Sequence, residues 1–489
     1  MGLLVTSNIL HVFTGLGFFA ALTAALAAIN LAMCYPDLRP DTKAMTGLLF
    51  GFAAATFLVT GAPLMAWVEG LIEMVGIIGF IIVCRFLALP LRISRYDRFL
   101  REIFLARKPN PSTLYRLSML ATYALGTFVI FGSLPIIYNI LDGICEWGKK
   151  SKQLIGTAMT RGYASLLLWA PASVMVVTSL KVTGATWFGI APVGFGVSLA
   201  MLALGLVMRP FRDRGSFQDA PLVSLRAEGC SSGHRDRTGG SQWGDSRGGS
   251  SEGGDGRTGD NGVGGSSISL CIAFAALVVI FVAFQSFTTM GPIYTMTVIA
   301  IPFSVAWIAI TSGIKELRRV FIPSLADSLG ASSAQSALLI SVGLATRALD
   351  ETGLSTWLSR TVSYLMPRLG MVGVIFCIAA AILFLGMMGI YPLFSIVAIG
   401  KGLAAARGGL AMAAPGAALS VIPAETLALS LILGGSVSYI VCPITATTLV
   451  ISSFFDVSPL EAGIRWNTAY AWAYVSLGAV FIYVLGRLL

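Results

Sequence analysis

The sequence predicts an all-α polytopic membrane protein with two related halves, and three observations support this prediction. Of the 489 residues, 56% are hydrophobic and only 11% are charged, whereas about 25% of residues are charged in an average soluble domain. So much apolar surface has to face lipid. A polar stretch divides the chain into two hydrophobic halves. Each half carries an apolar segment that is interrupted by proline and lined by Ser and Thr.

The expected membrane elements are apolar segments that follow one another along both halves. They lie near 8–33, 46–68, 70–91, 117–140, 163–182, 186–208, 268–289, 292–313, 334–349, 370–400, 409–422, 426–450 and 467–487. A spanning helix needs about 20 apolar residues, and several of these segments are shorter or are cut by Pro or Gly. Such segments predict re-entrant hairpins and broken helices, which are tolerated where protein buries them or where they line a cavity.

The polar stretch sets the expected domain organisation. We expect a first membrane repeat over 1–209, a linker over 210–266 and a second membrane repeat over 267–489. The linker is rich in Gly, Ser, Arg and Asp and has little to bury, so it is expected to be disordered and flexible. Simple tethering explains it, and a regulatory or docking role is the alternative.

The two interrupted segments match each other without gaps. Gly162–Ile190 aligns with Gly434–Ala462 at a constant offset, which pairs Pro171 with Pro443 and Ser173 with Thr445. Interrupted segments at matching positions of two halves point to the binding site of a secondary transporter. Chance alignment of two low-complexity apolar segments is the alternative for a single match of this kind.

A second match makes the repeat an inverted one. Gly132 and Pro135 correspond to Gly389 and Pro392 at an offset that differs from that of the first match. The same offset aligns the arm 92–116 with the arm 349–373. The first arm has seven basic and two acidic residues, and the second has two of each. Basic residues favour the cytoplasmic face, so the two arms are expected on opposite sides of the membrane.

The candidate site residues cluster around the interruptions. Proline removes a backbone donor and breaks the helix, which frees carbonyls for a cation and helix N-termini for an anion. Lys181 is either a counter-charge for an anion or a residue that reaches the interface, and helix packing is the alternative role of each single hydroxyl. The predicted substrate and ion ligands are Ser173, Thr178, Ser179, Lys181, Thr445, Thr447, Thr448, Ser452 and Ser453. The predicted helix-breaking residues are Pro135, Pro171, Pro392 and Pro443.

Other classes of function find little support. The chain has no CxxC, HExxH or P-loop motif, so we expect neither an enzyme nor a cofactor, and no metal beyond a possible Na⁺. The formal net charge of +10 fits basic cytoplasmic loops better than a nucleic-acid partner.

The interrupted segments resemble the ion transporter superfamily of secondary transporters. This group includes divalent-anion/sodium symporters, arsenite and NhaD-type carriers, C4-dicarboxylate carriers and gluconate permeases. The resemblance rests on Ala170–Trp187, Cys442–Asn467 and Gly389–Ser395. It implies inverted repeats with scaffold helices, re-entrant hairpins and broken helices, and a homodimer that works by an elevator-type motion. The Ser-Asn-Thr triplets of the dicarboxylate branch are absent, since the corresponding positions read Pro171-Ala172-Ser173 and Pro443-Ile444-Thr445.

The expected function is therefore secondary active transport of a small anionic metabolite, a carboxylate, coupled to Na⁺ or H⁺. The expected location is the cell (inner) membrane, with multiple passes through the lipid bilayer. A cation/proton antiporter on the same fold is one alternative, and it would need a buried carboxylate such as Asp142 or Glu69. A non-transporting polytopic membrane protein is the other.

Overall fold

The computed structural model describes residues 1–86, 110–128, 132–142, 147–210, 292–315, 333–413 and 422–488, with isolated residues between these ranges. Throughout these ranges the regular structure is helical and no strand occurs. The predicted all-α class is thereby confirmed. Nearly all of the predicted linker, most of the arm 92–116 and residues 414–421 of the predicted segment 409–422 lie outside the described residues.

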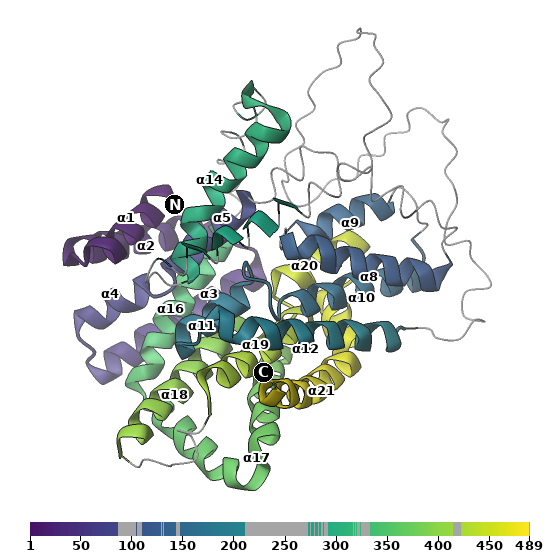
Figure 1. Cartoon of the computed structure of the whole chain (residues 1–489). Coiled ribbons are helices and arrows are strands. Elements are labelled where there is room, and N and C mark those ends of the chain that lie inside the picture. The colour runs from purple at the N-terminus through teal and green to yellow at the C-terminus, as the bar shows by residue number, and fades with distance from the viewer. Residues whose placement is uncertain are drawn as a thin grey trace.

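Helices follow one another along both halves of the chain (Figure 1). Those of the first half are α1 (Gly2–Thr14), α2 (Gly17–Cys34), α3 (Pro40–Thr60), α4 (Leu64–Ile72), α5 (Val75–Phe86), α8 (Pro111–Phe128), α9 (Ser133–Asp142), α10 (Lys149–Leu166), α11 (Val174–Thr183) and α12 (Trp187–Val207). Those of the second half are α14 (Pro292–Ser312), α16 (Ser333–Glu351), α17 (Leu354–Met387), α18 (Pro392–Ala413), α19 (Ala424–Val441), α20 (Ala446–Phe455) and α21 (Trp466–Leu488). A 3₁₀ turn (Tyr35–Asp37) follows α2, and a π-helical turn (Glu461–Arg465) precedes α21.

Glycine and proline decide several helix boundaries. The segment predicted over 8–33 is two helices, because the chain turns at Gly15 with a left-handed φ of 66°. Left-handed backbone is free of steric cost only for glycine, which makes it a common helix terminator. Helix α3 begins with Pro40, which needs no backbone donor at that position, and ends at the left-handed Gly61.

The boundary predicted between 46–68 and 70–91 is wrong. Helix α3 already ends at Thr60, and Leu64–Val83 forms one apolar segment that includes Glu69 and Glu73. Glu69 separated the predicted segments because an isolated carboxylate is costly in lipid. In the structure both carboxylates have cationic partners from other helices, so they lie within a spanning segment instead of a loop.

Seven helical segments of the described residues are long and apolar enough to cross a membrane. They are Gly17–Asp37, Thr42–Thr60, Leu64–Val83, Trp187–Val207, Arg368–Met387, Ala424–Phe455 and Glu461–Arg487. Large apolar side chains such as Leu58 and Val59 stand almost fully exposed on the outside of the fold, as lipid-facing residues do. The chain is thus an all-helical, multi-pass membrane protein.

The helices pack as two bundles that do not coincide with the two halves of the sequence (Figure 1). In bundle A, which comprises α1–α5, α14 and α16, helices α3 and α4 pack on α16 and α5 packs on α14. In bundle B, which comprises α8–α12 and α17–α21, α10 packs on α8 and α19 packs on α17. The larger contacts between the bundles join α16 to α17 and α18, and α11 to α5 and α14. Each half of the chain contributes to both bundles.

Candidate functional site

Bundle B contains two broken helices, one from each half of the chain. Helix α10 ends at Leu166 and α11 begins at Val174, and Pro171 lies in the interruption. Helix α19 ends at Val441 and α20 begins at Ala446, and Pro443 lies in that interruption. The other two predicted helix breakers lie elsewhere. Pro135 stands in the first turn of α9 and Pro392 begins α18, positions at which proline is compatible with a helix.

A hydroxyl closes each break in the same way. Ser173 Oγ donates to the carbonyl of Leu167 at 3.0 Å, and Thr445 Oγ1 donates to the carbonyl of Tyr439 at 2.7 Å. Both hydroxyls are completely buried. In each case the donor stands six residues after the acceptor, so the side chain spans the interruption and replaces helical bonds that proline prevents.

The second half-helices also end alike. Helix α11 terminates at Gly184 with φ 70°, and α20 terminates with φ 50° at Asp456, the residue that aligns with Gly184. Among the described residues Asp456 is the single non-glycine with positive φ, a conformation that aspartate tolerates better than most residues. Beyond these ends, Thr186 and Ser458 each accept a hydrogen bond at 3.2 Å from the backbone N–H three residues later.

The two broken helices pack against each other. Helix α10 contacts α19 and α20, and α11 contacts α19. Three buried tyrosines lie where these elements meet. The ring of Tyr163 stacks on Tyr439 at 6.3 Å, and Tyr391 meets Tyr439 edge-on at 6.5 Å. Tyr163 also interacts with Thr447 at the start of α20.

Sequence reasoning missed these three tyrosines. Each of them stands in or beside one of the matched segments. An aromatic residue in such a segment was therefore the signal in the sequence that could have identified them as site residues. A tyrosine fits this position because its ring packs in an apolar interior and its hydroxyl can serve a polar ligand.

Two of the predicted ligands are buried hydroxyls that no group of the described residues satisfies. Thr178 Oγ1 and Ser179 Oγ, both on α11, are fully buried and have no hydrogen-bond partner. Their helix faces α18 and α19, since Met175 approaches Gly435 and Val182 approaches Gly400. Buried hydroxyls without a partner cost about 1–3 kcal/mol each, so these two are free to serve a ligand.

Of the remaining predicted hydroxyls, those of Thr448, Ser452 and Ser453 are bonded within the second broken helix. Thr448 Oγ1 pairs with Thr445 Oγ1 at 3.0 Å, and Ser452 donates to the carbonyl of Leu449. Ser453 is exposed and donates to the carbonyl of Val450. The structure therefore places Thr447 and Thr448 at the break, and Ser452 and Ser453 at the far end of α20.

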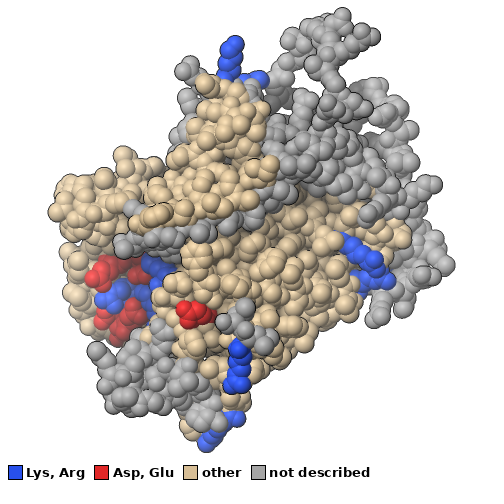
Figure 2. Space-filling model, viewed as in Figure 1, with Lys and Arg blue, Asp and Glu red and all other residues tan. Residues whose placement is uncertain are grey.

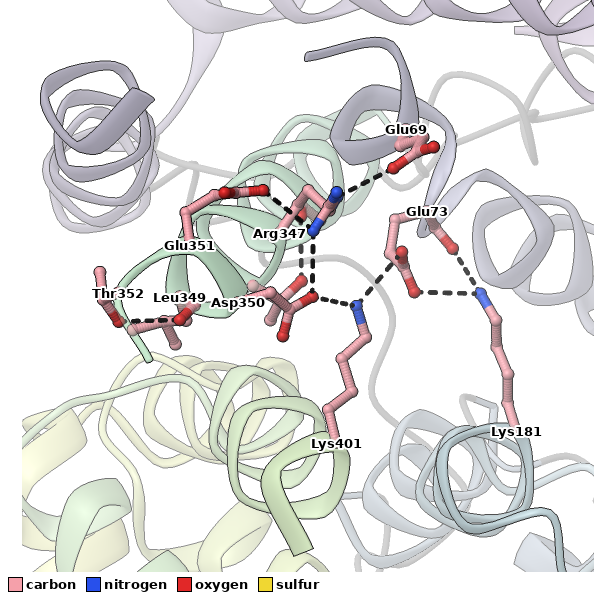
Figure 3. Close-up of polar contacts among 11 residues, drawn as sticks. Glu69, Glu73, Lys181, Arg347, Leu349, Asp350, Glu351, Thr352 and Lys401 are labelled. Atoms are coloured by element: carbon pink, nitrogen blue, oxygen red, sulfur yellow. Dashed lines mark hydrogen bonds and ion pairs between the residues drawn. The ribbon is translucent and has the colours of Figure 1, made fainter. Parts of the chain in front are cut away.

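Lys181 does not lie at the break but takes part in a network of charges (Figures 2 and 3). It stands at the end of α11, where its Nζ donates to the backbone carbonyl of Glu73 at 2.6 Å and lies 3.6 Å from the carboxylate of that residue. Lys401 on α18 reaches the other carboxylate oxygen of Glu73 at 3.3 Å and Asp350 at 3.4 Å. Figure 2 shows acidic and basic side chains gathered in one patch, whereas the other charged side chains in this view stand apart from it.

Arg347 extends the network inside bundle A. Its Nε donates to Glu69 at 2.9 Å, and its Nη1 lies 3.8 Å from Asp350 and 3.3 Å from Glu351. Arg347, Asp350 and Glu351 stand together at the C-terminal end of α16. Their contact with Glu69, Glu73 and the two lysines depends on other helices and left no local pattern in the sequence.

Arg161 is a buried cation of the first broken helix. Its Nη1 donates to Tyr115 at 3.2 Å and to the carbonyl of Met208 at 2.6 Å, and its Nε points to Asn467 Oδ1 at 3.5 Å. The guanidinium also lies 4.7 Å from the centre of the Tyr470 ring. No carboxylate of the described residues pairs with it. Instead Arg161 binds the C-terminal end of α12, where the helix dipole favours a cation, and joins α10 to α8, α12 and α21.

Within the described part of the chain, no group of His, Cys, Asp or Glu side chains could hold a metal ion. Comparison with known proteins finds no family model and no curated protein that matches this sequence.

Proposed function

We propose that the protein is a secondary active transporter for a small anionic metabolite, a carboxylate, coupled to Na⁺ or H⁺. It would act as a homodimer in the cytoplasmic membrane and bind its substrate at the two breaks of bundle B. The observation that carries this proposal is the pair of broken helices, in which two hydrogen bonds of the first half recur at aligned positions of the second half. Matching interruptions in two halves are typical of transporter binding sites.

Helix packing supports an internal repeat as the basis of this site. The order α8, α9, α10, α11, α12 is followed in the second half by α17, α18, α19, α20, α21, with a break in the same place. Contacts also occur in corresponding pairs. Helix α10 packs on α8 as α19 packs on α17, α11 packs on α18 as α20 packs on α9, and α10 contacts α12 as α19 contacts α21.

The chemistry of the breaks suits an anion together with a small cation. Helices α11 and α20 begin at the breaks, and the first N–H groups of a helix lack intrahelical partners and carry partial positive charge. Their hydroxyl neighbours Thr178 and Ser179 are unpartnered. The ends of α10 and α19 offer carbonyl oxygens, which are ligands that Na⁺ accepts in broken transporter helices. Since Lys181 is held by Glu73, the anion would be bound by dipoles and hydroxyls instead of a fixed cation.

A cation/proton antiporter is the second candidate, and the position of Glu73 favours it. This carboxylate lies in a spanning segment between two lysines, and intramembrane carboxylates often carry protons. The two carboxylates first considered for this role fit less well. Asp142 is exposed and accepts a hydrogen bond from Trp147, and Glu69 is 44% exposed beside Arg347.

Charge movement in proteoliposomes separates the two candidates. The protein would be challenged with a panel of carboxylates in Na⁺ and in Na⁺-free buffer at two pH values. A saturable current or uptake for one acid supports the anion transporter and identifies the coupling ion. Proton flux driven by a cation gradient, insensitive to every acid and lost in Glu73→Gln, would support the antiporter instead.

Thr178→Val tests the binding site without weakening the fold. The substitution keeps the shape of the side chain and removes a buried hydroxyl that has no partner. We therefore expect the free energy of unfolding to stay equal or to rise by about 1 kcal/mol, while transport falls by about tenfold or more because a ligand hydroxyl is lost.

Thr46→Val is the matched control for this test. Thr46 on α3 of bundle A is likewise buried and unpartnered, so the same chemical change should leave transport unchanged. If Thr178→Val and Thr46→Val transport equally well, α11 does not contribute the site. Thermal unfolding of both variants shows whether any loss of transport reflects the fold.

A further inference from the structure

The charge network lies where the two bundles meet. Glu69 stands on α4 and Glu73 directly after the C-terminal end of α4, and Asp350 stands on α16. All three belong to bundle A. Lys181 on α11 and Lys401 on α18 belong to bundle B. Figure 3 shows the two lysines extending from separate helices toward the acidic groups across this boundary.

The charges are sorted by bundle. The bundle A side of the described network carries four carboxylates, those of Glu69, Glu73, Asp350 and Glu351, against the guanidinium of Arg347, so its net charge is negative. Bundle B contributes the two lysines to this network. Attraction therefore acts across the boundary. The ion pairs of Arg347, in contrast, lie within bundle A, where they orient Glu69, Asp350 and Glu351.

Lys181 has a second acceptor that strengthens its position. Besides the Glu73 carboxylate it binds the Glu73 carbonyl at 2.6 Å, and Glu73 is the residue at which α4 ends. The C-terminal end of a helix carries partial negative charge and attracts a cation. Glu73 therefore holds both lysines, since Lys401 takes its second carboxylate oxygen at 3.3 Å.

We propose that Lys181 and Lys401 form an electrostatic latch that holds bundle B against bundle A through Glu73 and Asp350, and that the latch must open when bundle B moves. The larger direct contacts between bundles involve few helices, namely α16 with α17 and α18 and α11 with α5 and α14. Single ammonium–carboxylate pairs, unlike bidentate arginine pairs, have loose geometry and separate readily. The side chains are also partly open, with Glu73 at 19%, Lys401 at 24% and Lys181 at 39% exposure.

The role of the latch rests on the proposed function, because the latch would hold one conformation of an alternating-access cycle. The contacts that form the latch do not depend on that function. A device of this kind has to be strong enough to populate the closed state and weak enough to open. Breaking it should therefore shift the conformational equilibrium before it affects any ligand site.

Hydrogen exchange of the full-length protein in nanodiscs, read by mass spectrometry without substrate, tests the latch. In Lys181→Met and Lys401→Met we expect amide exchange in 64–86 and at the C-terminal end of α16 to rise by about threefold or more, as local opening becomes easier. Methionine preserves the apolar stem of lysine and removes the charge. Glu73→Gln removes the negative charge that both lysines share and should reproduce the effect in a protein that keeps both lysines.

Glu351→Gln is the matched control from the same network. It removes an ion pair with Arg347 that lies within α16 and does not cross the boundary, so exchange in the same segments should stay at the wild-type level. Unchanged exchange in both lysine variants and in Glu73→Gln would overturn the latch, and so would an equal rise in Glu351→Gln. Hydrogen exchange does not depend on transport, so the latch can be tested even if the protein moves no carboxylate. If the protein does transport a carboxylate but exchange is unchanged in the variants, the latch is rejected and the proposed function is not.

Discussion

Alanine at Gly434 is expected to destabilise the protein by about 3 kcal/mol or more, despite the better helix propensity of alanine. Gly434 lies where α19 crosses α17, and a Cβ at this position would lie 2.7 Å from the carbonyl oxygen and 2.8 Å from the Cα of Ala379. These are backbone atoms, so no side-chain rotation relieves the clash and the two helices have to separate. Gly162 is the counterpart in the first half, and its Cβ would meet the Met119 carbonyl on α8 still more closely.

The measurement is thermal unfolding of purified protein, together with the yield of monodisperse material. Gly51→Ala is the control, because a Cβ there has no neighbour within 4 Å and Gly51 also lies inside a helix. This variant should be equal in stability or gain up to about 1 kcal/mol from helix propensity. If Gly434→Ala and Gly162→Ala unfold at the same temperature as Gly51→Ala, the close helix crossings next to the two breaks are not present.

Methionine at Arg161 is expected to lower the free energy of unfolding by about 3 kcal/mol. The substitution keeps an apolar stem but removes the donors that Met208, Tyr115 and Asn467 share. These acceptors are then left in a buried site, where each unsatisfied polar group is costly. The effect should reach the first broken helix, because Arg161 precedes the break and joins α10 to the helices around it.

Arg487→Met is the matched control for this prediction. Arg487 is exposed in the last turn of α21, so the same change in side chain should shift stability by less than about 0.5 kcal/mol. Thermal unfolding of both variants in one detergent gives the comparison. Equal unfolding temperatures would show that Arg161 is not the link between α8, α10, α12 and α21.

The membrane class, the two breaks and their correspondence follow from the order of residues alone. The apolar content requires lipid, and Pro171 and Pro443 each remove a backbone donor within an apolar segment, which favours an interruption of the helix. Pro171 and Pro443 lie in the interruptions of the structure, and the alignment of the two segments recurs in the hydrogen bonds that Ser173 and Thr445 make. These properties are local, so they could be predicted before any packing was known.

Segment boundaries were predicted less well where charges intervened. Glu69 marked the edge between two predicted segments, yet it lies with Glu73 inside the single segment Leu64–Val83. Their partners Arg347 and Lys401 stand far away in the sequence, and without partners a carboxylate in an apolar segment indicates a loop. The sequence cannot show that such a charge will be neutralised.

Which residues meet depends on tertiary packing and could not be predicted. Packing combined both halves of the chain in each bundle, buried Thr178 and Ser179 without partners, and drew Lys181 away from the break to Glu73. Bundle membership depends on which helix faces fit together, and membrane helices associate through close packing of small residues and polar contacts whose partners are distant in sequence. The role of a hydroxyl or a lysine in this protein follows from those neighbours, and they are set by the packing of the whole chain.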